Sequence, residues 1–137
     1  MPSILIVEDE TATAWAIAES LKDDGHETST VESAEDALIR LRDGSLDLVI
    51  TDLRLPGMSG VQLARRVRTG RNPLPVIVVT AFGSKQALAE LEGFGVHAVF
   101  PKPFRVEQLR RSVRDALGIA GSAEDPRPAR SGRGGTT

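Results

Sequence analysis

The sequence predicts an α/β protein built around a parallel β-sheet. Short apolar runs cover residues 4–7, 48–51 and 76–79, and they are rich in Val, Ile and Leu. Runs of this length, separated by stretches with helical periodicity, are typical of parallel strands that are buried on both faces. Two weaker segments, 27–31 and 96–100, add further strands, so that five strand–helix units follow one another along the chain.

Each predicted strand is followed by apolar residues at helical spacing. Ser33, Ser59 and Ser84 stand where the helices of units two, three and four begin, and Ser is a favoured N-cap. Gln62 completes the capping-box spacing after Ser59, whereas Asp36, after Ser33, is shorter than the preferred Glu or Gln. The apolar positions expected to face the sheet are Ala14, Ile17, Ala18, Leu21, Ala34, Ala37, Leu38, Leu41, Leu63, Ala64, Val67, Leu88, Leu91, Val106, Leu109, Val113 and Leu117.

Reactive polar residues stand where the predicted strands end. They are Glu8 and Asp9 after the first apolar run, Asp52 after the second, Thr80 after the third, and Lys102 between two prolines after the last strand. In parallel α/β sheets, ligands bind in the crevice outside the carboxyl ends of the strands. The chain therefore delivers three carboxylates, a hydroxyl and an ammonium to one rim, a set that suits a divalent cation and a phosphoryl group.

Asp52 is the residue that we expect to act as a nucleophile, because a carboxylate after a buried strand must be paired or lie at the mouth of a site. Taken alone, it could equally be an N-cap or an Asx-turn before Pro56. Glu8 and Asp9 could simply be acids that favour the start of the next helix. Three carboxylates at one rim repel one another unless a cation lies among them, and an all-oxygen set favours Mg²⁺.

Thr80 and Lys102 also allow simpler readings, as a strand-end cap and as a lysine whose ammonium reaches water. Together they would place a hydroxyl donor and a positive charge beside the same acceptor oxygens. Asp is known to form an aspartyl-phosphate, and the remaining chemistry of phosphoryl transfer is positioning and electrostatics. Pro103 allows a cis peptide bond that would orient Lys102.

The composition narrows the class of protein. A chain of 137 residues with 40% hydrophobic and 26% charged residues fits one globular domain. No apolar run approaches the roughly 20 residues of a membrane span, and no signal-peptide pattern precedes the first strand. The absence of cysteine excludes thiolate metal sites and favours a cytoplasmic location. A net charge of −2 does not support direct binding to nucleic acid.

We expect the folded domain to cover residues 1–118. Residues 119–137 consist largely of Gly, Pro, Ser and Arg and have almost no aliphatic side chains, so they cannot offset the entropy of ordering. We therefore expect a disordered C-terminal tail, with a linker to a further domain as the alternative.

Taken in order, the polar motifs resemble the receiver domain of two-component response regulators over about residues 3–117. The matching elements are Glu8-Asp9, Asp52 followed by the loop 55–60, Thr80-Ala81 and Lys102-Pro103-Phe104. The resemblance implies a flavodoxin-like (βα)5 fold, a doubly wound sheet of strand order 2-1-3-4-5. It also implies that a sensor histidine kinase or a phosphotransfer protein phosphorylates Asp52.

The resemblance assigns roles to the site residues as well. Mg²⁺ would be held by four of them: Asp9, Asp52 and the main-chain carbonyl of Arg54 directly, and Glu8 through water. Thr80 and Lys102 would bind the phosphoryl oxygens and report their presence. The protein would then be a phosphorylation-switched signalling module rather than an enzyme with a separate substrate. Its partner would be a downstream protein or, through phosphorylation-dependent dimerisation, a second copy.

One departure from the family pattern affects the read-out of phosphorylation. Receiver domains usually carry Tyr or Phe three residues before the Lys, and here that position is Val99. The aromatic residue comes one place later, at Phe100, where strand alternation predicts that it points into the core. Arg54 and Phe82 are larger than the small residues often found at their positions. We therefore expect intact phosphorylation chemistry and a read-out that depends on movement of the loop 81–83.

Other classes of protein fit less well. A haloacid-dehalogenase-type hydrolase has a second Asp two residues after its nucleophile, and after Asp52 that place is taken by Arg54. A nucleotide-binding flavodoxin-like protein would need a Gly-rich phosphate loop, which follows none of the predicted strands. We expect Trp15 to be partly packed, and His26 and His97 to be structural or exposed.

Overall fold

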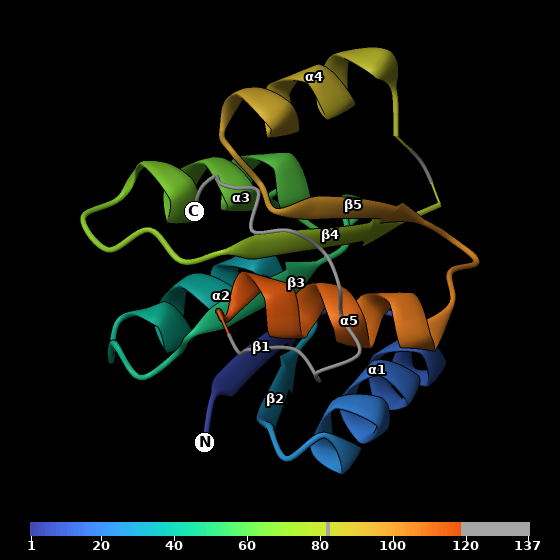
Figure 1. Cartoon of the computed structure of the whole chain (residues 1–137). Helices are drawn as coiled ribbons and strands as arrows, with labels where there is room; N and C mark the ends of the chain where they lie inside the picture. Colours follow the sequence, from blue (N-terminus) through green and yellow to red (C-terminus); the bar gives the residue numbers. More distant parts are fainter. Residues whose placement is uncertain (82, 119–137) are drawn as a thin grey trace.

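The computed structural model describes residues 1–81 and 83–118, which form a five-stranded sheet between two layers of helices (Figure 1). The strands are β1 (Ser3–Val7), β2 (Glu27–Val31), β3 (Leu48–Thr51), β4 (Val76–Thr80) and β5 (Ala98–Pro101). The helices are α1 (Thr11–Asp23), α2 (Ala34–Leu41), α3 (Gly60–Thr69), α4 (Lys85–Gly93) and α5 (Val106–Ala116). The expected tail, residues 119–137, and Phe82 lie outside the described residues.

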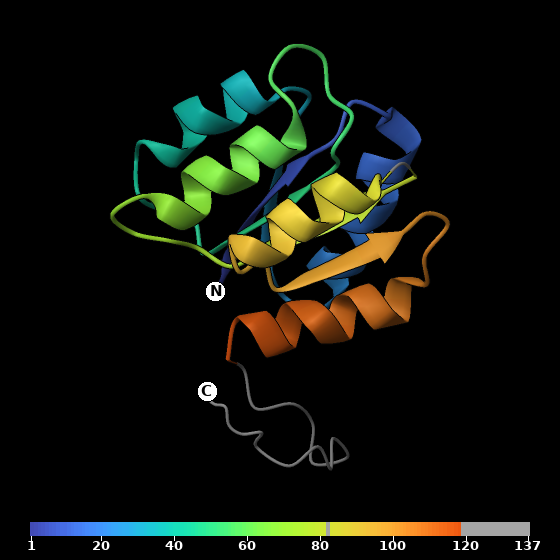
Figure 2. The same cartoon turned by 90° about the horizontal axis from the view of Figure 1, so that it is seen from above.

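The strands are all parallel, in the order β2-β1-β3-β4-β5. Helices α1 and α5 cover one face of the sheet, and α2, α3 and α4 cover the other (Figures 1 and 2). This is the doubly wound, flavodoxin-like arrangement, so the predicted fold class and strand order are confirmed. The strand order reverses between β1 and β3, and in such sheets the crevice at this switch point is the usual place for a ligand.

Each face of the sheet has its own hydrophobic core, and β1 shows why its apolar run is continuous. Ile4 and Ile6 pack under α1 and α5, whereas Leu5 and Val7 pack under the other three helices, and all four are fully buried. The same alternation places Val99 and Phe100, neighbours in β5, on opposite faces of the sheet. Val99 packs against the core under α2 to α4 and Phe100 against the core under α1 and α5, as predicted.

The helix starts follow the serine signals. Ser59 and Gln62 form a complete capping box, with reciprocal bonds of 3.2 and 3.0 Å. The side chain of Ser84 accepts a bond from the first turn of α4. Ser33 accepts a bond of 3.1 Å from the N–H of Asp36, and no return bond is recorded from the shorter Asp side chain.

Trp15 corrects the sequence reading, because it is 66% exposed rather than partly packed. Its neighbour Ala14 belongs to the buried stripe of α1, and a one-residue step turns the indole about 100° away from that stripe. β5 also begins at Ala98, two residues later than predicted. His26 is 5% exposed, and its ring nitrogens have no hydrogen-bond partner among the described residues. None of the described helices has the length and apolarity needed to cross a bilayer.

Candidate functional site

Asp52 lies at the carboxyl end of β3, beside the switch point of the sheet. Its N–H donates to the carbonyl of Val7 at 3.1 Å, which extends the β1–β3 ladder by one bond. The N–H groups of Leu53 and Arg54 donate to its Oδ1 atom at 2.6 and 3.3 Å. Asp52 is 6% exposed. Backbone donors thus hold the carboxylate in one orientation at the edge of the core.

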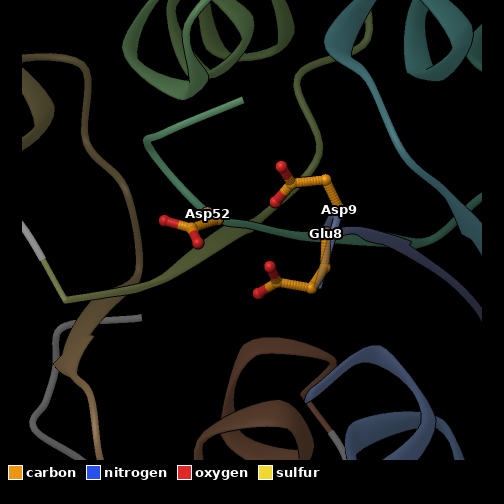
Figure 3. Close-up of side chains that lie close together, drawn as sticks. All are labelled: Glu8, Asp9 and Asp52. Carbon is orange, nitrogen blue, oxygen red and sulfur yellow. The ribbon is translucent and has the colours of Figure 1, made fainter. Parts of the chain in front are cut away.

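Two more carboxylates follow β1 directly and point toward the same place (Figure 3). Glu8, Asp9 and Asp52 each offer a carboxylate oxygen, and these oxygens lie within 4.8 Å of one another. Glu8 is 2% exposed, whereas Asp9 is exposed to solvent. The cluster is therefore open on the Asp9 side and closed on the Glu8 side.

Lys102 reaches this cluster from the loop after β5. Its Nζ atom donates to Asp52 Oδ2 and to Glu8 Oε1, each at 2.9 Å, and lies 3.7 Å from Glu10 Oε1. The Lys102–Pro103 peptide bond is cis, as the sequence allowed. The ammonium thus bridges two carboxylates that follow β1 and β3.

The electrostatics of the site follow from burial and these contacts. Burial raises the pKa of the Glu8 carboxyl and the charge of Asp52 adds to the effect, while the bonds from Lys102 and the Glu10 N–H oppose it. Burial alone would lower the pKa of Lys102, but its hydrogen bonds to Asp52 and Glu8 outweigh burial and raise it. The ammonium is therefore charged at neutral pH, and one cation faces three carboxylates.

Thr80 and Arg54 complete the set of predicted residues at this rim. Thr80 ends β4 and is 3% exposed, and its carbonyl accepts a 2.8 Å bond from the N–H of Lys102. The N–H of Arg54 donates to Asp52, so the backbone of Arg54 lies beside the cluster. The structure brings every predicted site residue to the carboxyl edge of the sheet.

The donor set fits a hard divalent cation. The carboxylates of Glu8, Asp9 and Asp52 present oxygen ligands only, and a single ammonium does not balance their charge. One oxygen from each carboxylate lies within 4.8 Å of the other two, so the three side chains converge on one place where a cation would lie.

The sequence reading missed two contributors to the site. Glu10 donates its N–H to Glu8 Oε2 at 3.1 Å and places a third carboxylate, an exposed one, near Lys102. Gly60 begins α3 against the backbone of Asp52, where a Cβ atom would lie 2.0 Å from the Asp52 carbonyl oxygen. The signal for Gly60 was a glycine, a poor helix former, directly after the N-cap of a helix.

The chain matches the family model for the response regulator receiver domain over residues 4–114. It therefore belongs to the receiver domains of two-component response regulators, a family of signalling domains.

Individual relatives agree with this assignment. The chain is 40% identical over 124 residues to the response regulator protein FleR of Pseudomonas aeruginosa. The alignment covers 89% of this chain and 26% of that protein. It is 37% identical to the two-component response regulator PhoP of the same organism, over 83% of this chain and 51% of that protein.

A solved structure of a CheY-like response regulator receiver domain protein from Methanospirillum hungatei has a TM-score of 0.82 at 25% identity. The alignment covers 86% of this chain and 94% of that chain. The chain spans about a quarter to a half of the length of the curated relatives that it matches.

Proposed function

We propose that this domain accepts a phosphoryl group on Asp52, in a Mg²⁺-dependent reaction with a histidine kinase or a phosphotransfer protein. The observation that carries the proposal is the contact of Lys102 with Asp52 inside a cluster of three carboxylates. A lysine with one carboxylate would be an ordinary salt bridge, and the surplus of carboxylates supports a cation site with a nucleophile inside it.

The position of each site residue decides its proposed role in binding Mg²⁺ or in orienting Asp52. Asp9, Asp52 and the main-chain carbonyl of Arg54 would hold the ion directly, and Glu8 would act through water. When bound, Mg²⁺ would neutralise charge on the oxygens of the incoming phosphoryl group. The two backbone N–H groups at Asp52 Oδ1 keep the carboxylate in place as the donor approaches.

Transfer from a phosphohistidine would break a phosphorus–nitrogen bond, form a phosphorus–oxygen bond at Asp52, and leave the imidazole of the donor with the released electron pair. The esterified oxygen would lose its charge, so Lys102 would exchange its bond to Asp52 for one to a phosphoryl oxygen. Thr80, which is joined to Lys102 through the backbone, would donate its hydroxyl to another phosphoryl oxygen.

We further propose that the output is a change in protein–protein contacts in the cytoplasm and not turnover of a separate substrate. A groove of about 600 Å³ between α4 and β5 supports this idea, because Thr80 lines one end of it and Leu88 and Val99 line its sides. A shift of Thr80 could therefore alter this groove without an aromatic side chain at Val99. The downstream protein, or a second copy of the domain, would read that change.

Substituting Asp52 tests the proposal. With phosphoramidate and Mg²⁺, the intact mass of the parent protein should rise by one phosphate, and Asp52→Asn should abolish the increase. Asp36→Asn is the matched control, because Asp36 is an exposed acid on α2, and it should be labelled like the parent. Labelling that persists in Asp52→Asn, or that is unchanged by chelation of the metal, would refute the assignment.

A further inference from the structure

A second groove lies between α2 and α3, at the edge of the sheet opposite to Asp52. It has a volume of about 330 Å³ and is bounded by the loops that lead into β3 and β4. The apolar side chains that line it are Leu38, Leu41, Leu46, Val67 and Leu74. Because these loops precede their strands, the groove remains accessible when a phosphoryl donor covers the opposite edge.

The polar part of the lining is rich in donors. Arg66 and Arg71 line the groove together with Asn72, and no carboxylate does. Both arginines are exposed, and neither makes a hydrogen bond or ion pair within the part of the chain that the structure describes. The nearby acid Asp43, on the loop after α2, is already bound by Ser45 and Arg40. The groove therefore carries positive charge without a local counter-charge.

An exposed aliphatic side chain lies on α2, the helix that contributes Leu38 and Leu41 to this groove. Ile39 on α2 is 57% exposed. It lies one turn after Glu35, so the two share a helix face. Glu35 accepts a 2.9 Å bond from the N–H of Met58, on the loop that leads into α3. Ile39 thus leaves apolar surface on α2 open to solvent.

We propose that the α2–α3 groove binds an amphipathic segment of a partner protein whose apolar residues alternate with acidic ones at helical spacing. Leucines on such a segment would fill the apolar lining, and its carboxylates would pair with Arg66 and Arg71. Docking of a helix in a groove between two helices uses this pattern of apolar anchors. Charge complementarity sets the sign of the partner, because the groove offers two unpaired cations and no anion.

The proposal is independent of the chemistry at Asp52, and NMR titration of the ¹⁵N-labelled full chain tests it. The probe is an Ala-based helical peptide of about 18 residues with Leu at i, i+3, i+4 and i+7 and Glu beside them. Its matched control has Lys in place of Glu. The Glu peptide should shift the amide signals of Gly44, Gly70 and Asn72, which line the groove, and the Lys peptide should bind more weakly.

Variants separate docking in the groove from general attraction. The double variant Arg66→Glu, Arg71→Glu should weaken binding of the Glu peptide by about tenfold or more, since two attractions become repulsions. Arg65→Glu changes the same charge on the same helix, but Arg65 does not line the groove, so it should have a much smaller effect. Far-UV circular dichroism of each variant confirms that the fold is intact.

Four results would overturn the proposal. They are equal binding of the Glu and Lys peptides, an equal effect of Arg65→Glu and of the double variant, shifts centred on the α4–β5 groove at Leu88 and Ala98, and no binding at all. Concentration-dependent shifts of the same groove amides without peptide would instead identify a second copy of the chain as the occupant. The phosphorylation of Asp52 is measured separately, so either proposal can fail alone.

Discussion

Replacing Gly60 by Ala probes how closely α3 lies against the backbone of the acceptor residue. A Cβ atom at this position would lie 2.0 Å from the carbonyl oxygen of Asp52 and 2.7 Å from Cα of Leu53. Non-bonded carbon atoms prefer separations of about 3.5 Å, so the two backbone segments would have to part by about 1 Å. No side-chain rotation can relieve this contact, because both neighbours are main-chain atoms.

The magnitude follows from opposing effects. Ala is the better helix former by about 1 kcal/mol in a helix interior, and by less in the first turn. Overpacking costs about 1–3 kcal/mol. Moving α3 would also weaken the 2.9 Å bond from the Gly60 N–H to the Leu53 carbonyl, which is worth about 1 kcal/mol. We expect the free energy of unfolding to fall by about 2 kcal/mol, the result of adding these terms.

Urea denaturation monitored by far-UV circular dichroism measures this change, because the exposed Trp15 would report little on unfolding by fluorescence. Gly93→Ala in α4 is the matched control. A Cβ there would meet no atom within 4 Å, so this variant should be as stable as the parent or up to about 1 kcal/mol more stable. Labelling of Gly60→Ala with phosphoramidate should also slow, because Asp52 moves with its backbone. Equal or greater stability of Gly60→Ala would refute the reasoning.

Two further substitutions test the electrostatics. Asp9→Asn should lower Mg²⁺ affinity, measured by calorimetry, at least several-fold. The same variant should stabilise the metal-free domain by about 0.5–1 kcal/mol, since it removes repulsion among the carboxylates. Unchanged affinity would place the ion elsewhere. Burial lowers the pKa of His26 below the usual 6.5, with Asp24 opposing this and Arg114 adding to it. The unfolded chain then binds a proton at His26 more readily than the folded chain does. The contribution of His26 to the free energy of unfolding is therefore fully present above about pH 6.5 and falls by up to about 1.4 kcal/mol per pH unit below it. His26→Leu should lack this part of the decline, and parallel stability curves for parent and variant between about pH 7 and 5 would contradict it.

The sequence determined the elements of this protein and the edge at which its polar residues meet. Four consecutive apolar residues such as those of β1 can be buried only if both faces of the strand are covered, which requires a parallel sheet with helices on each side. Because parallel strands all end at the same edge, the polar residues at the ends of β1, β3, β4 and β5 were enough to predict the cluster around Asp52. Ser59 and Gln62 marked the start of α3 for an equally local reason, since a capping box joins residues three apart.

Only the tertiary structure decided which residues far apart in the sequence are in contact. The bond from Lys102 to Glu8 joins residues 94 positions apart, and no periodicity predicts which carboxylate the ammonium would select. The need for glycine at position 60 appeared only when α3 was seen against the backbone of Asp52. Trp15 is exposed and His26 is buried, the reverse of what the hydrophobicity of their side chains suggests. The phase of α1 decides the exposure of Trp15, and the turn before β2 decides the burial of His26. The positive α2–α3 groove also exists only in the fold, since its lining comes from two helices and two loops that packing brings together.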